Sequence, residues 1–162
     1  MIKSLLRTNN DVAPLILRVL LGAVFIPHGA QKVLGWFGGH GFEGTMGYFT
    51  GALGIPALFA FLAIAAEFSG ALALIAGFFT RAAAAGIAAV MAVAMTMHAQ
   101  HGFFMNWSGA QKGEGIEFHL LAAGIAVVVM IVGGGKFSLD RFVADRPDSA
   151  DQWAPAEGIK QS

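Results

Sequence analysis

Four long apolar stretches constrain this chain more than any other feature of its sequence. A helix needs about 20 mostly apolar residues to cross the hydrocarbon core of a bilayer. Four stretches qualify, from about residue 12 to 34, 56 to 79, 82 to 101 and 116 to 133. Hydrophobic residues make up 56% of the chain and charged residues only 12%, which leaves no room for a soluble core between the stretches. The sequence therefore predicts an all-α transmembrane four-helix bundle.

The basic residues predict how this bundle is oriented. With the N-terminus inside, seven basic residues lie in the inner segments, and two, Lys32 and Lys112, lie on the outer side. We therefore expect both termini in the cytoplasm. The first stretch is too long for a signal peptide and is interpreted as a retained helix. Residues 1–141 are predicted to form the membrane domain and residues 142–162 a mobile cytoplasmic tail.

Small and aromatic residues predict how the helices meet and where the bundle is covered. Gly22 and Gly29 lie seven residues apart on the first helix, and small residues recur every three or four positions from 66 to 77. Small residues let membrane helices approach closely, so we expect a tight bundle or packing against another subunit. The long connection from 35 to 55 is rich in glycine and aromatics and is predicted to cover the outer end at headgroup level.

Composition also excludes several kinds of function. The net charge is zero, so no basic surface argues for a nucleic-acid partner. The absence of cysteine removes disulfides, thiolate metal sites and thiol redox chemistry. No haem, flavin or iron–sulfur motif is visible, so a redox role would need a partner subunit or a diffusible carrier.

Arg18 and Glu67 are the deepest charges in the predicted helices. An ionisable residue at the centre of a bilayer costs about 2.5–3.5 kcal/mol and normally faces the bundle interior, where it finds a partner. An arginine side chain is long enough to cover the difference in depth between the two positions. We expect an Arg18–Glu67 ion pair, which either fixes the helix register or leaves Glu67 as a proton-carrying carboxylate.

A second polar group lies near the outer ends of three helices. Histidines and carboxylates there can bind a metal, but no H-x-x-x-H or E-x-x-H pair supports one, and no metal site is predicted. A quinone headgroup fits better, because its carbonyls need donors and histidine can exchange the protons of reduction. The alternative is that each histidine only binds a carbonyl at a helix end. The predicted proton-carrying residues are Glu67 and His98, and the predicted quinone-binding residues are His28, Lys32, His98, Glu117 and His119.

Several segments together resemble a known family. They read R-V-L-L-G-A-V-F-I-P-H-G-A-Q-K from Arg18, A-E-F-S-G-A-L-A-L-I-A-G-F-F-T-R from Ala66, H-G-F-F-M-N-W from His101 and G-E-G-I-E-F-H-L-L from Gly113, closing with G-G-G-K-F-S-L-D from Gly133. In order and spacing the chain is similar to the DoxX family of bacterial four-helix membrane proteins, over about residues 12 to 141. The positions that recur in the family are Arg18, His28, Gly29, Lys32, Glu67, Gly70, Arg81, Gly115 and Glu117, whereas His119 departs from its usual pattern.

The resemblance implies a bacterial inner-membrane location and a choice of functions. Members of the family are similar to the small subunit of a thiosulfate:quinone oxidoreductase, which implies a quinone-linked oxidoreductase subunit with partner redox or membrane subunits. The alternative is a non-catalytic accessory or assembly subunit of a larger membrane complex. A transporter is a weaker third hypothesis, because no discontinuous helices or inverted repeat are visible. The electron donor and the oligomeric state do not follow from the sequence.

Overall fold

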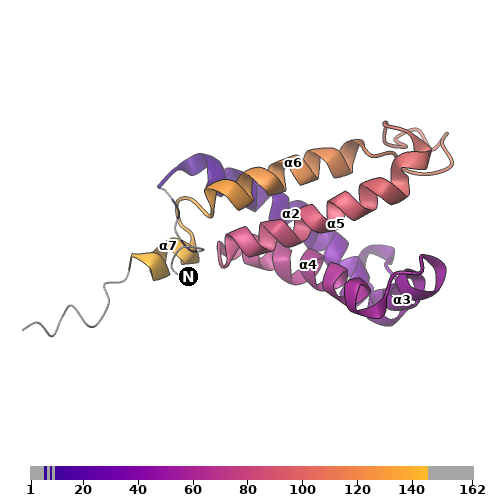
Figure 1. Ribbon diagram of the computed structural model, residues 1–162, viewed down its shortest axis with the longest axis horizontal. Coiled ribbons are helices and arrows are strands. Elements are labelled where there is room, and N and C mark those ends of the chain that lie inside the picture. Colours follow the sequence, from indigo (N-terminus) through magenta and orange to yellow (C-terminus); the bar gives the residue numbers. More distant parts are fainter. Residues whose placement is uncertain (1–5, 7, 9, 146–162) are drawn as a thin grey trace, which may run out of the picture.

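Four long helices dominate the computed structural model, which describes residues 6, 8 and 10–145 (Figure 1). Among these residues no strand occurs. Three helices are long and apolar enough to cross a membrane, whereas the fourth has 16 residues and spans about 24 Å at 1.5 Å per residue. The long helices are α2 (Val12–Leu34), α4 (Ala57–Ala76), α5 (Thr80–His98) and α6 (Glu117–Val132).

The helices begin and end close to the predicted positions. The prediction for α2 is confirmed at both ends, and α6 is one residue shorter at each end than predicted. The second helix ends at Ala76 rather than at 79, because Gly77 adopts a left-handed conformation with φ +67° and turns the chain. The third starts at Thr80 rather than at 82 and ends at His98, followed by the 3₁₀ turn η3 (Ala99–His101).

Both described ends of the chain lie at the same end of the bundle, here called the terminal end (Figure 1). The N–H of Lys136 donates to the carbonyl of Asp11 at 2.9 Å, and the N–H of Gly135 donates to the hydroxyl of Thr8 at 2.6 Å. A chain that crosses the membrane an even number of times has both of its ends on the same side, as is the case here. Which end faces the cytoplasm stays a prediction.

Short helices occupy both ends of the bundle. At the opposite end, here called the loop end, the predicted cover contains η1 (Trp36–Gly38), α3 (Gly41–Gly47) and the π-helical turn η2 (Tyr48–Ala52), and α3 packs against α2 and α4. At the terminal end, α7 (Leu139–Ala144) closes the described chain. Residues 142–144 therefore belong to a helix rather than to a tail. The rest of the predicted tail, from 146, lies outside the described residues.

Glycines allow α2 and α4 to touch backbone to backbone. A β-carbon added at Gly29 would lie 2.6 Å from the Cα of Phe68, and one added at Gly22 would lie 2.9 Å from the carbonyl oxygen of Ala71. The prediction that small residues form helix contacts is confirmed at these positions. The core between the helices is filled by larger apolar side chains, among them Phe25, Leu74, Ile87 and Val129.

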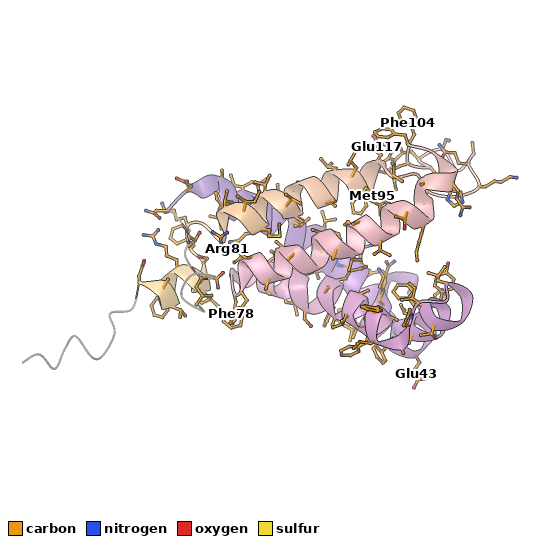
Figure 2. The ribbon with its side chains drawn as sticks, in the orientation of Figure 1. Glu43, Phe78, Arg81, Met95, Phe104 and Glu117 are labelled. Atoms are coloured by element: carbon orange, nitrogen blue, oxygen red, sulfur yellow. The ribbon has the colours of Figure 1, made fainter. Side chains whose placement is uncertain are left out.

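Large apolar side chains cover the outside of the bundle. Leu20 on α2, Phe59 on α4 and Leu121 on α6 are between 56% and 66% exposed. Such a surface suits acyl chains, because water would solvate it poorly. Aromatic residues gather at both ends, where Figure 2 places Phe104 at the loop end and Phe78 at the terminal end. Aromatics at two levels are typical of the two interfaces of a membrane.

Candidate functional site

Arg18 does not pair with Glu67, so the predicted ion pair is wrong. The Arg18 side chain is buried at the terminal end and donates to the carbonyls of Leu74 and Gly134, both at 2.8 Å, and of Phe137 at 2.9 Å. Antiparallel packing of α2 on α4 places Arg18 beside the C-terminal turn of α4, where carbonyls have no partner within the helix. Seven residues of helix, about 10 Å, separate Leu74 from Glu67.

Glu67 instead forms an ion pair with Lys32 near the loop end. The Nζ of Lys32 lies 2.5 Å from Oε2 of Glu67, and the two side chains are 24% and 6% exposed. Lys32 lies in the last turn of α2, and Glu67 lies at the middle of α4, so the lysine side chain reaches into the bundle. The pair therefore places a carboxylate and an ammonium group together in apolar surroundings.

His98 and His119 form a stacked pair between α5 and α6. Their ring centroids are 4.6 Å apart, with 24° between the ring planes. Nδ1 of His98 lies 3.1 Å from the carbonyl oxygen of Glu114. Nδ1 of His119 is buried and has no hydrogen-bond partner within the described part of the chain. His119 also lies near enough to Glu67 for their charges to interact.

These residues converge from four different helices. Lys32 comes from α2, Glu67 from α4, His98 from α5 and His119 from α6. We call them the four-helix polar cluster. An apolar bundle does not need four titratable groups to fold, and unpaired polar atoms inside it are costly. The cluster is consequently the best candidate for a functional site, and all four of its members were candidates from the sequence.

Two predicted site residues lie apart from the cluster. His28 is exposed on the surface of α2, with its ring 5.9 Å from that of Phe118 and 6.2 Å from that of Phe25. Glu117 begins α6 beside the connection that contains Phe104 (Figure 2), and its carboxylate accepts the N–H of Met105 at 3.2 Å. Glu117 therefore holds a loop, and His28 faces the surroundings of the bundle.

Sequence reasoning missed the role of Asp140. Its buried carboxylate accepts the N–H groups of Phe79 at 2.7 Å and of Thr80 at 2.8 Å, which caps the start of α5. Phe79 has a φ of +45°, a conformation that phenylalanine rarely adopts, and this capping holds it there. The resemblance included Asp140 in a motif, but only the fold brings it to residues 60 positions away.

A cavity of about 530 Å³ lies at the terminal end, and another of about 470 Å³ is lined by His40, Gly44 and Tyr48. Neither borders the four-helix polar cluster. Within residues 10–145, histidines and carboxylates do not gather in a group of three or more that could hold a metal ion.

Comparison with known proteins agrees with the architecture. The DoxX family model matches residues 13–107, which is more than half of the chain. The chain belongs to the DoxX family. It is also similar to the inner membrane protein YqjF of Escherichia coli K12, at 29% identity over 134 residues, covering 83% of this chain and 94% of that protein. No solved structure matches. The chain is accordingly a multi-pass protein of the bacterial inner membrane.

Proposed function

We propose that this DoxX protein is a membrane subunit of a quinone-linked redox complex, in which the four-helix polar cluster exchanges protons with a quinone. One observation carries the proposal: four titratable groups, Glu67 and His119 buried and Lys32 and His98 half-buried, converge near the loop end, and Nδ1 of His119 has no partner among the described residues. A histidine nitrogen without a partner is available to accept or donate a proton.

The outer surface near the cluster supports a route for a lipid-soluble ligand. Among the described residues, His28 is the single titratable side chain that the four long helices leave exposed on their surface. The rings of Phe25 and Phe118 lie next to it, and His119 follows Phe118 directly on the buried side of α6. A quinone ring could pack on the half-buried ring of Phe118 while His28 donates to one of its carbonyls.

The chemistry of this proposal needs an external electron source. Reduction of a quinone to a quinol takes up two electrons and two protons. The described residues supply proton-exchanging groups, and the sequence carries no motif for a redox cofactor. A partner redox subunit therefore delivers the electrons. We place both termini in the cytoplasm, because most basic residues then lie on the inner side.

Quinone extraction tests the proposal. The protein is purified in mild detergent with its native lipids, and bound quinone is quantified by chromatography. We expect His28→Leu and His119→Phe to retain about fivefold less quinone than wild type, because each loses about one hydrogen bond. His40→Leu is the matched control, since His40 lies at the start of α3. Wild-type protein without bound quinone would refute the proposal.

A second candidate function is that of an accessory subunit, and the surface of α5 favours it. In an apolar 18-residue stretch of Thr80–His101, only 17% of the residues are buried, compared with 33% in the corresponding stretches of α2 and α4. Most of the exposed residues of α5 are small, including Ala82, Ala89 and Thr96, although Val93 is exposed as well. Small exposed residues allow a partner helix to approach closely.

A steric variant separates this accessory role from the redox role. Ala89→Trp should release a partner subunit during purification without unfolding the bundle, because Ala89 points away from it. Leu121→Trp on the exposed face of α6 is the control. Equal recovery of partners with both variants would count against docking on α5.

A further inference from the structure

Buried Arg18 organises the loop between α6 and α7. Its guanidinium donates to the carbonyls of Gly134 and Phe137 and, at 3.4 Å, to that of Lys136. The N–H of Lys136 donates to the carbonyl of Asp11 at 2.9 Å, so the backbone of this residue is fixed from both sides. The loop therefore presents the Lys136 side chain from a rigid position at the terminal end.

A surface cavity of about 530 Å³ lies beside this loop and α7. Among the described residues that line it are two cations, Lys136 and Arg141, and one anion, Asp145, which together carry one net positive charge. Arg141 lies 3.2 Å from Asp145 and also donates to the side chain of Asn10. Lys136 has no carboxylate partner within the described part of the chain, and its Nζ lies 5.1 Å from the centre of the Phe137 ring.

Two phenylalanines from the lining extend outward next to these charges. Phe137 is 77% exposed and Phe142 is 60% exposed. Exposed phenyl rings beside basic groups match the boundary between acyl chains and headgroups, because the rings enter the apolar layer and the cations stay at its polar edge. The two chemistries together indicate a ligand that is both anionic and lipidic.

We propose that the cavity of Asn10, Lys136, Phe137, Arg141 and Phe142 binds the phosphate of an anionic phospholipid. Lys136 contacts the phosphate, Arg141 contributes the donors that Asp145 does not occupy, and the two rings pack on the glycerol and upper acyl region. Basic pockets at the end of a helix bundle are typical sites for such headgroups. This inference does not depend on the proposed quinone chemistry, because the cavity lies at the other end of the bundle from the four-helix polar cluster.

Lipid titration of the full-length protein in detergent, followed by native mass spectrometry, tests this site. We expect phosphatidylglycerol to bind more tightly than phosphatidylcholine. Lys136→Gln should weaken its binding about fivefold, the effect of one basic residue near a membrane surface. Arg141→Gln should weaken it less, because Asp145 already offsets part of that charge. Asp145→Asn should strengthen binding, which no loss of folding would produce.

The controls distinguish the sources of the phosphate and the role of total charge. Lys112→Gln removes one exposed cation from the loop end and should leave binding unchanged. Inorganic phosphate at millimolar concentration should not displace phosphatidylglycerol. Equal affinity for the two lipids, displacement by inorganic phosphate, an equal loss in Lys112→Gln, or unchanged or weaker binding in Asp145→Asn would each overturn the proposal.

Discussion

A double-mutant cycle on Lys32 and Glu67 tests the pairing that the structure assigns to them. The Nζ of Lys32 lies 2.5 Å from Oε2 of Glu67, but the two side chains differ in exposure, at 24% for Lys32 and 6% for Glu67. Removing one partner of a fully buried ion pair costs about 3–5 kcal/mol, because the other charge is left without compensation. The difference in exposure makes the two single variants unequal.

Lys32→Met should be the more damaging change. It leaves the Glu67 carboxylate enclosed at the middle of α4, and we expect a loss of about 3–4 kcal/mol in the free energy of unfolding. Glu67→Gln should cost only about 1–2 kcal/mol, because the longer Lys32 side chain can turn toward the headgroups. The double variant should be close to Glu67→Gln alone, which gives a coupling energy of about 3–4 kcal/mol.

The measurement is equilibrium unfolding in mixed micelles, followed by tryptophan fluorescence. A second cycle with Arg18→Lys and Glu67→Gln serves as control. Arg18 bonds to carbonyls at the terminal end, so the effects should add to within about 0.5 kcal/mol. Additive effects in the Lys32 cycle, or strong coupling in the Arg18 cycle, would refute the assigned pairing.

Three further variants test other parts of the structure. Gly29→Ala should lower stability by about 2 kcal/mol in the same assay, because its β-carbon meets the backbone of Phe68, whereas Gly124→Ala, with no atom within 4 Å, should be neutral or slightly stabilising; equal effects would contradict the close approach of α2 and α4. Asp140→Ala should cost about 1–2 kcal/mol and speed hydrogen exchange at Thr80, because the cap of α5 is lost; unchanged exchange there would argue against the cap. Glu117→Gln should speed exchange at Met105 with a change in bundle stability below about 0.5 kcal/mol, and unaltered exchange would show that the carboxylate does not hold the loop.

The bounds of the helices could be predicted from the sequence, because the apolar length that a membrane helix needs is a property of its own residues. A run of apolar residues has to satisfy its backbone internally in lipid, so length and hydropathy alone predict α2 and α6 to within a residue. The turn between α4 and α5 was placed less well. Its position depends on the left-handed conformation of Gly77 and on capping by Asp140, which is distant in sequence.

The pairing of buried charges could not be read from the sequence with the same accuracy. Depth arguments placed Arg18 and Glu67 within reach of one another, but they ignored the free carbonyls at the end of α4. An arginine has five donors and can satisfy several carbonyls at once, so it did not need a carboxylate. Glu67 pairs with Lys32 instead, a residue that the sequence analysis had predicted to bind the quinone.

The predicted quinone site was partly assembled by the fold. Lys32, His98 and His119 converge with Glu67, because each lies on an inward-facing position near the loop end. His28 and Glu117 do not join them. Helical spacing showed that His28 shares a face with Lys32, but the exposure of His28 depends on the way α2 packs against α4 and α6, which spacing does not contain.

An experimental map of the protein in nanodiscs of native lipid tests the central claim most directly. The account predicts Lys32 and Glu67 in hydrogen-bonding contact inside the bundle, with His98 and His119 stacked beside them and additional density at Nδ1 of His119. A map with Lys32 extended into the headgroups, Glu67 facing acyl chains and the two histidine rings apart would contradict it.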